Sequence, residues 1–181
     1  MKKEKYMFGC CNPFFSSSCR CNSCCCGRMP PAPAPIFPPV TPQPLPQLRG
    51  MQLSLAGSSG GTVQNGANIP FDTVGANNML GVSYAPGSGT VTISRTGTYL
   101  VNWWVAVEGT QTAESLAFAI SLNGTDVQTS YSDIGGGQVY GTAIVNVTSI
   151  PATLSLVNRS GDAVTYVTAS GQSGMSMVQY A

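Results

Sequence analysis

The cysteines of this chain are confined to its first part, and this limits what the rest can fold into. All seven lie between Cys10 and Cys26 of 181 residues, and none follows Cys26. A disulfide framework that stabilises a small fold has its cysteines spread over that fold. Any domain formed after this cluster must therefore be held by its own hydrophobic core. The cysteines are expected to act on another chain, a metal or a surface.

Composition divides the chain into three segments. Residues 1–28 form a Cys-rich tail that contains every cysteine. Residues 29–50 form a Pro-rich arm, in which nine prolines lie between Met29 and Leu48 without any charged residue. Because proline fixes φ and lacks an amide donor, this arm is expected to be an extended polyproline-II segment of roughly 60 Å. Residues 51–181 are predicted to be the folded head.

The Pro-rich arm also contains apolar side chains that a solvated linker does not need. It therefore has two interpretations, a spacer or a docking peptide, and the sequence does not decide between them. The docking residues predicted by the second interpretation are Ile36, Phe37, Val40, Leu45 and Leu48.

The head is predicted to be all-β, because short runs rich in Val, Ile, Thr, Tyr and Phe alternate with clusters of Gly, Asn, Ser and Asp. About eight short strands in a head of this length are typical of a sandwich, and we expect a jelly-roll β-sandwich with an extended amino-terminal tail. Asn123-Gly124 predicts a hairpin, since both residues tolerate positive φ. The expected strands are Gln52–Leu55, Thr90–Ser94, Thr98–Glu108, Ser115–Leu122, Gly141–Thr148, Ala152–Val157, Ala163–Val167 and Met175–Tyr180.

The longest expected strand, Thr98–Glu108, is apolar on both of its faces. A strand of this kind is covered on both sides. One side is expected to meet the core of the sandwich. The other is expected to meet a second subunit, with coverage by a loop of the same chain as the alternative. The predicted subunit interface contains Tyr99, Val101, Trp103, Trp104 and Val105.

Charge is sparse and unevenly distributed. Residues 1–50 contain six basic side chains and one acidic one, whereas residues 51–181 contain two basic and six acidic ones. This asymmetry favours contact between the basic tail of one copy and the acidic head of another. The basic residues are too thinly spread to neutralise a nucleic-acid backbone, so we expect no nucleic-acid partner. No apolar run is long enough for a membrane helix, so we expect no membrane partner.

The chain offers little for catalysis. It has no histidine, which excludes Ser-His-Asp and Cys-His pairs and imidazole metal ligands. Its carboxylates are scattered and form no dense calcium-binding motif. We therefore expect a protein that is not an enzyme and that holds no cofactor.

The cysteines are the one reactive group, and their use stays open among three readings. Neighbouring cysteines rarely bond to each other, and an odd number favours disulfides between chains. The spacing Cys21-x-x-Cys24 leaves a zinc or copper cluster as a rival, and a partly reduced tail is the third reading. The candidates for intermolecular disulfides are Cys10, Cys11, Cys19, Cys21, Cys24, Cys25 and Cys26.

Three segments, Gly97–Ala106, Phe118–Gly124 and Ala152–Asn158, resemble the carboxy-terminal heads of bacterial spore-surface collagen-like proteins such as the collagen-like glycoprotein of the Bacillus exosporium. The resemblance covers about Met51–Ala181. It implies the jelly roll of the complement and tumour-necrosis-factor families, a tight homotrimer, and a structural or adhesive role. The chain lacks the Gly-X-Y stalk of that family, and its tail is instead similar in plan to the connectors of endospore appendage pilins.

These features predict a structural subunit of a spore-surface layer or fibre, which self-assembles through its tail. The expected partners are copies of itself and proteins of the spore coat or exosporium. The sequence start lacks the apolar run of a secretory signal, so we expect synthesis in the mother cell and later oxidation at the spore surface. The alternative is a trimeric adhesive head that recognises a glycan or a host protein and is anchored by the tail. A metal-storing tail is a third possibility.

Overall fold

The head of the chain is built of β-strands alone in the part that the structure describes. The structure is a computed structural model, and it describes residues 48–57, 61–109, 113–133 and 136–180. The strands in chain order are β1 (Arg49–Leu55), β2 (Thr62–Val63), β3 (Thr73–Asn77), β4 (Val82–Tyr84), β5 (Val91–Ile93), β6 (Gly97–Val107), β7 (Leu116–Leu122), β8 (Thr125–Ser132), β9 (Gly137–Val147), β10 (Ala152–Asn158), β11 (Val164–Thr165) and β12 (Ser173–Tyr180).

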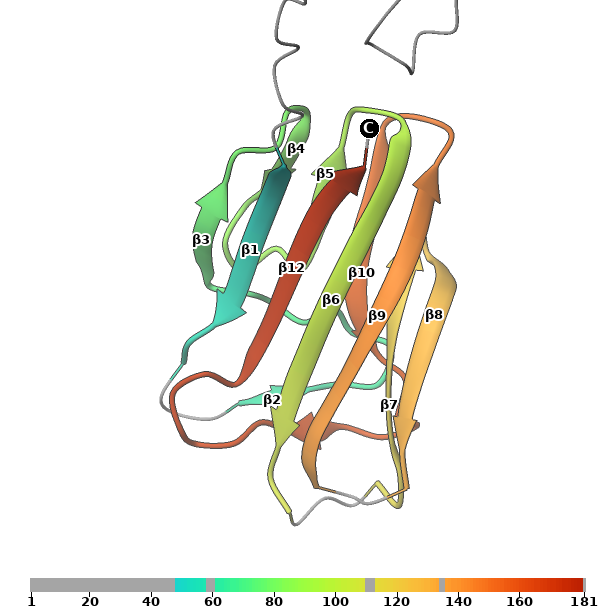
Figure 1. Cartoon of the computed structure of the whole chain (residues 1–181). Coiled ribbons are helices and arrows are strands. Elements are labelled where there is room, and N and C mark those ends of the chain that lie inside the picture. Colours follow the sequence, from blue (N-terminus) through green and yellow to red (C-terminus); the bar gives the residue numbers. More distant parts are fainter. Residues whose placement is uncertain (1–47, 58–60, 110–112, 134–135, 181) are drawn as a thin grey trace, which may run out of the picture. The chain divides into compact units, whose positions relative to one another are not determined.

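Two five-stranded antiparallel sheets pack face to face. One has the order β3-β1-β12-β6-β9 and the other β4-β5-β10-β7-β8. Figure 1 shows the first sheet in front of the second, with the small β11-β2 pair crossing below them. Strands that are neighbours in a sheet are mostly distant in the sequence, as in β1 beside β12 and β6 beside β9. This is a jelly-roll sandwich, and the expectation of an all-β jelly roll is confirmed.

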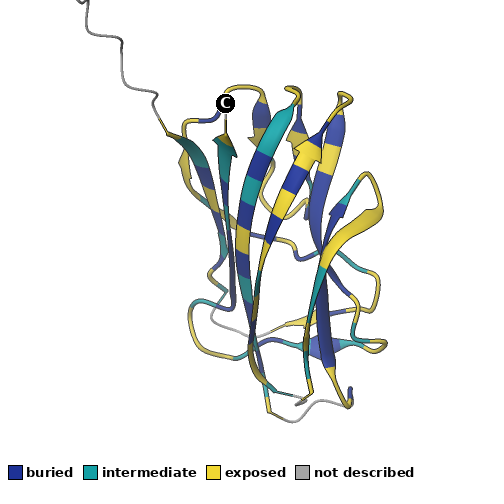
Figure 2. Ribbon diagram, turned by 45° about the vertical axis from the view of Figure 1, so that its right-hand side comes forward, coloured by how far each residue is buried: buried dark blue, intermediate teal, exposed yellow. Residues whose placement is uncertain are grey.

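Alternation of side chains builds the core between the two sheets. In β6 the burial pattern alternates along the strand, and Tyr99, Val101, Trp103, Val105 and Val107 are all at most 2 % exposed. The same alternation is visible along the long strands in Figure 2, where buried and exposed positions follow one another. A period of two places every second side chain on the same face of a sheet. The core therefore needs no disulfide within the described residues.

The expected strands all have counterparts in the structure, but four strands were not predicted. Those four are β2, β3, β4 and β8. Strands β2, β3 and β4 are short, and β8 is mostly polar. None of the four has the apolar alternation that marks a strand in a sequence. The Asn123-Gly124 hairpin is confirmed, because these residues join β7 to β8 with φ angles of 51° and 82°. Strand β1 begins at Arg49, so the last two residues of the predicted arm belong to the sheet.

Both faces of β7 are buried within this single chain. Its outward residues are small, with Ala117, Ala119 and Ser121 all at most 4 % exposed. The backbone amide of Arg159 donates to the carbonyl of Ala117 (2.7 Å), and the Arg159 side chain reaches Asp126, which pairs with Ser121 in the β7–β8 ladder. Segments of the same chain therefore cover the small outward residues of β7.

Replacing Asp126 with asparagine is expected to weaken the acid sensitivity of the head. Arg159 Nε and Nη2 donate to the two carboxylate oxygens at 2.8 and 2.9 Å, and this bidentate contact lowers the pKa of Asp126. A carboxylate whose pKa is lower in the folded than in the unfolded protein stabilises the fold above the unfolded-state pKa. This stabilisation is lost as the pH falls through the folded-state pKa. Urea unfolding between pH 7 and pH 2 should show a flatter pH dependence for Asp126→Asn, with a loss at pH 7 of at most about 1 kcal/mol. Equal pH profiles for the two proteins would contradict this role.

Asn158 is a fully buried polar side chain of the sandwich, at 0 % exposed. Its Nδ2 donates to the carbonyls of Val63 and Asp162, both at 3.0 Å, and its Oδ1 accepts from the Ser160 amide at 2.9 Å. One amide group therefore connects the end of β10, the β2 strand and the 159–163 turn. Buried polar groups need such partners, because an unpaired one costs the full desolvation energy.

Candidate functional site

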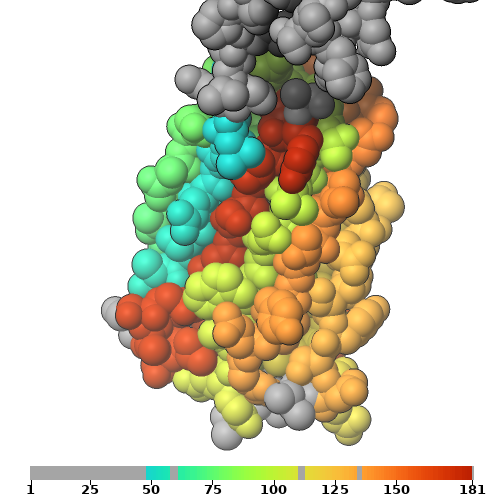
Figure 3. All heavy atoms as spheres, viewed as in Figure 1, coloured from blue at the N-terminus to red at the C-terminus, as the bar shows by residue number. Residues whose placement is uncertain are grey.

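The outward surface of the β3-β1-β12-β6-β9 sheet carries no charge on its four long strands. We call this surface the neutral face. Figure 3 shows it as a continuous surface of β1, β12, β6 and β9 running diagonally across the molecule. Its side chains are Gln52, Ser54, Thr98, Leu100, Asn102, Trp104, Ala106, Gln138, Tyr140, Thr142, Ile144, Asn146, Ser176, Val178 and Tyr180.

One end of the neutral face is apolar. Thr98, Leu100, Ile144 and Tyr180 line a hollow of about 360 Å³ there. Ile144 is 71 % exposed and Tyr180 57 % exposed, although most large apolar side chains of the head are buried. Exposed apolar groups that lie together on a surface mark a contact with another molecule more often than isolated ones do. We call this part the apolar end.

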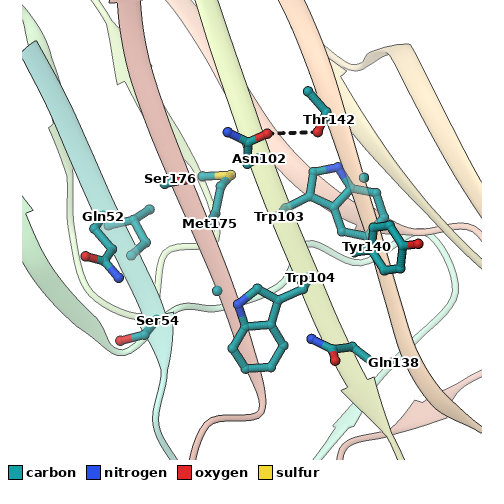
Figure 4. A pocket seen from close by; sticks show the side chains of 13 residues that line it. Gln52, Ser54, Asn102, Trp103, Trp104, Gln138, Tyr140, Thr142, Met175 and Ser176 are labelled. Atoms are coloured by element: carbon teal, nitrogen blue, oxygen red, sulfur yellow. Dashed lines mark hydrogen bonds between the residues drawn. The ribbon is translucent and has the colours of Figure 1, made fainter. Parts of the chain in front are cut away.

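The middle of the neutral face contains a second hollow of about 440 Å³, built around Trp104. Figure 4 shows the Trp104 indole lying across β12. Space for the ring exists because Gly174 lacks a side chain: a Cβ there would lie 2.6 Å from Trp104 Nε1 and 3.1 Å from Cε2. Gly174 is the direct ladder partner of Trp104. The glycine therefore lets an aromatic ring lie against the sheet instead of standing on it. We call this site the Trp104 hollow.

Amides and hydroxyls from four strands surround the indole. They come from β1, from β6 and β9, and from β12, and they are Gln52, Ser54, Asn102, Gln138, Tyr140, Thr142 and Ser176. The Thr142 hydroxyl donates to Asn102 Oδ1 at 2.8 Å, which fixes the orientation of that amide and leaves its Nδ2 donor directed elsewhere. Among the described residues, the side-chain amides of Gln52 and Gln138 have no hydrogen-bond partner. The hollow therefore offers unpaired neutral donors and acceptors beside a flat apolar ring.

Beneath this face the core is tightly packed around Trp103. Its ring meets Phe118 edge-on, with centroids 6.2 Å apart and an interplanar angle of 60°. Gly141 lies opposite Trp103 in the β6–β9 ladder, and a Cβ there would lie 2.6 and 2.7 Å from the Trp103 ring. Trp103 Nε1 is buried without a hydrogen-bond partner among the described residues. Position 141 therefore requires glycine, because the Trp103 ring leaves no space for a Cβ atom there.

The residues predicted for a subunit interface divide between the two faces of β6. Tyr99, Val101, Trp103 and Val105 lie in the core of the sandwich, each at most 2 % exposed, so their assignment to an interface was wrong. Only Trp104 of the predicted set points outward, as Figure 4 shows. The larger apolar set of an alternating strand is the one that the second sheet covers. The outward set consists of Leu100, Asn102, Trp104 and Ala106 together with Thr98.

Most of the residues predicted to act in the tail lie outside the described residues. These are Cys10, Cys11, Cys19, Cys21, Cys24, Cys25 and Cys26 of the tail and Ile36, Phe37, Val40 and Leu45 of the arm. Leu48 is described: its side chain is 71 % exposed, and its carbonyl accepts from Asn78 Nδ2 at 3.5 Å. It borders a hollow of about 390 Å³ that Gly50 and Val178 also line. Leu48 therefore lies beside the neutral face, at the start of β1.

Neither a metal centre nor a membrane segment is found in the described ranges. No three side chains of His, Cys, Asp or Glu come together there as metal ligands. No helix in that part of the chain is long and apolar enough to cross a membrane. The one buried phenol without a hydrogen-bond partner in the same residues is Tyr166, and burial raises its pKa because the phenolate would lose its hydration.

The residues around Trp104 were not predicted from the sequence as a site. Gln52, Gln138, Tyr140 and Gly174 come from three strands and are ordinary polar or small residues in their own segments. Pairing of β1 with β12, β12 with β6 and β6 with β9 brings them together. The available signal was the sparse charge of the whole segment, which indicates an uncharged surface but does not locate it.

Comparison with known proteins supports the fold of the head and does not show a family for the chain. No protein-family model matches the chain, and no curated protein matches it. Among solved structures, the chain is similar to murine APRIL crystallised at pH 8.5, with a TM-score of 0.57, 9 % identity, and coverage of 74 % of this chain and 100 % of that chain. It is also similar to Eiger TNF from S. frugiperda, with a TM-score of 0.59, 12 % identity, and coverage of 74 % and 93 %. The head of this chain therefore has the jelly-roll fold found in tumour-necrosis-factor proteins.

Proposed function

We propose that this protein is a structural subunit of a spore-surface layer or fibre, without enzymatic activity, which assembles from copies of itself. The observation that carries the proposal is the apolar end of the neutral face. Ile144 and Tyr180 are largely exposed there, and no charged side chain of the described residues keeps that surface in water. Each large apolar side chain that such a surface buries contributes about 1.5–3 kcal/mol when fully removed from water.

The first level of assembly in this proposal is a homotrimer. The jelly-roll fold supports it through the resemblance to spore-surface heads, which implies a trimer. The apolar end supplies a surface that a second copy of the chain can cover. Burial of the predicted interface residues in the core does not remove this support, because outward residues of the apolar end, Leu100, Ile144 and Tyr180, form the contact instead.

The second level of assembly uses the amino-terminal tail. The seven cysteines lie in a basic segment, and the head is acidic. We propose that the tail of one trimer docks on the next trimer and that disulfides between chains lock this contact. The resemblance to spore-surface proteins supports a place on the spore surface, with spore coat or exosporium proteins as further partners.

Replacing Ile144 with aspartate is expected to separate the copies. The side chain is 71 % exposed, so the folded monomer should keep its stability, whereas a charge in an apolar contact opposes association. Sedimentation velocity of the full chain in reductant should change from a particle of three chain masses to one of a single chain mass. Leu80→Asp is the matched control, because Leu80 is 50 % exposed but lies outside the neutral face. A wild-type protein that is monomeric at all concentrations would disprove the trimer.

Negative-stain electron microscopy with and without reductant tests the second level. Oxidised wild-type protein should form extended assemblies that reductant separates into discrete particles with folded heads. An oxidised full chain that stays as discrete trimers would refute assembly through the tail. A stoichiometric content of zinc or copper in the purified protein would support the metal-binding tail instead.

The second candidate function is an anchored adhesive head. It is favoured by a separate feature, the Trp104 hollow, whose unpaired amides and flat ring do not follow from a role in assembly.

A further inference from the structure

The Trp104 hollow has the two parts of a binding site for an uncharged ring compound with many hydroxyl groups. One part is the indole, which is held flat in the gap over Gly174 and also approaches Gly171, where a Cβ would lie 3.7 Å from its Cη2. The other part is the surrounding set of amides and hydroxyls. An aromatic ring with one face on the backbone presents its other face as an apolar platform.

The chemistry of the ligand follows from these two parts. A pyranose sugar has faces of C–H groups, which suit an indole, and a rim of hydroxyls, each of which can donate and accept. The side-chain amides of Gln52, Asn102 and Gln138 also combine donors with acceptors, and Ser54 and Tyr140 add hydroxyls. Specificity in small-molecule sites comes from a few polar groups of this kind around an apolar surface.

The uncharged lining of the hollow excludes anionic and cationic ligands. None of the residues that line the hollow is charged. A phosphate or carboxylate ligand is recognised by Arg or Lys, and a cationic ligand by carboxylates. We therefore propose that the Trp104 hollow binds a neutral carbohydrate, with Trp104 as the platform and Gln52, Asn102 and Gln138 as the hydrogen-bonding groups.

This site is compatible with association of copies through the apolar end. Leu100 and Trp104 are both outward residues of β6, four positions apart, which corresponds to about 13 Å along a strand. The hollow is also large enough, at about 440 Å³, for one or two sugar rings. The proposal needs a folded head and does not depend on the assembly described above.

The test is saturation-transfer NMR on the full chain in reductant, with methyl glycosides of glucose, galactose, mannose, rhamnose and N-acetylglucosamine and with their disaccharides. A monosaccharide of about twelve heavy atoms on an open surface is expected to bind with a Kd on the order of 1 mM. The chain has two tryptophans, and Trp103 is only 2 % exposed, so a saturable fluorescence change on titration reports mainly on Trp104.

Three variants locate the site. Trp104→Ala should abolish binding, and Gln138→Ala should weaken it about tenfold. Gly174→Ala should also weaken it about tenfold, because the added Cβ displaces the indole without removing any polar group. Leu80→Ala is the control: Leu80 is 50 % exposed and lies outside the neutral face, so its loss should leave binding unchanged. Sedimentation velocity of each variant separates loss of the site from loss of assembly.

Several outcomes would overturn the proposal. One is the absence of a saturable signal from every glycoside at 20 mM, with ~20-fold excess over the expected Kd. Others are binding that survives both Trp104→Ala and Gly174→Ala, and selective binding of charged sugars. Dissociation of the assembly by Trp104→Ala, without any sugar signal from the wild type, would assign the hollow to a contact with a second copy.

Discussion

Replacing Gly141 with valine is expected to destabilise the head by about 3 kcal/mol. The position points into the core opposite Trp103, and even a single added carbon would lie 2.6 and 2.7 Å from two atoms of that ring. Ser130 closes the same space from β8. Trp103 cannot move away freely, because Phe118 packs against it. For a head of this size the loss corresponds to a decrease of about 10 °C in Tm.

The measurement is thermal unfolding of the full chain by circular dichroism in reductant, with urea unfolding as a second probe. Gly75→Ala is the matched control, since an added Cβ in β3 would make only ordinary contacts at 3.7–3.8 Å with Gln52. The control should unfold within about 0.5 kcal/mol of the wild type. A Gly141→Val protein as stable as that control would show that the Trp103 region is loosely packed.

Replacing Asn158 with alanine is expected to cost about 3 kcal/mol. The change removes two donated hydrogen bonds and one accepted bond, and it leaves the carbonyls of Val63 and Asp162 and the amide of Ser160 without these partners. Since Asn158 is 0 % exposed, water does not replace the lost partners without a rearrangement of the β10 end. The β11-β2 pair should also become more accessible, since Val63 belongs to β2.

Urea unfolding and amide hydrogen exchange check this prediction together. Asn146→Ala is the control, because Asn146 is an exposed asparagine of β9 and its loss should change stability by less than about 0.5 kcal/mol. Faster exchange confined to β2, β10 and the 159–163 turn is the expected pattern. Unchanged stability in Asn158→Ala would mean that these backbone groups find other partners.

The fold was predictable to the extent that single strands show alternation. Strand β6 could be assigned from residues 98–108 alone, because its apolar side chains recur at every second position. Strand β8 could not, since its eight residues are mainly polar and its place at the edge of a sheet demands no apolar face. The same limit applies to the buried Ala117, whose carbonyl accepts from the backbone amide of Arg159, a residue far away in the sequence.

The predicted interface shows a second limit. Apolar residues on both faces of β6 correctly indicated a strand covered on its inner face. The set without a polar residue lies inside, whereas the set that contains Thr98 and Asn102 lies outside. Tyr99 and Trp103 were assigned to a subunit contact, and the structure places them in the core.

The sequence by itself determined an all-β head without histidine or cysteine, preceded by a Pro-rich arm and a tail with all seven cysteines. These properties depend on composition and local periodicity, which a single chain displays directly. Only the tertiary structure decided which residues form the neutral face, because strand pairing joins Gln52, Trp104, Gln138 and Gly174 from four separate segments. A surface of this kind exists only after the sheet has formed, since each strand contributes no more than every second residue to it.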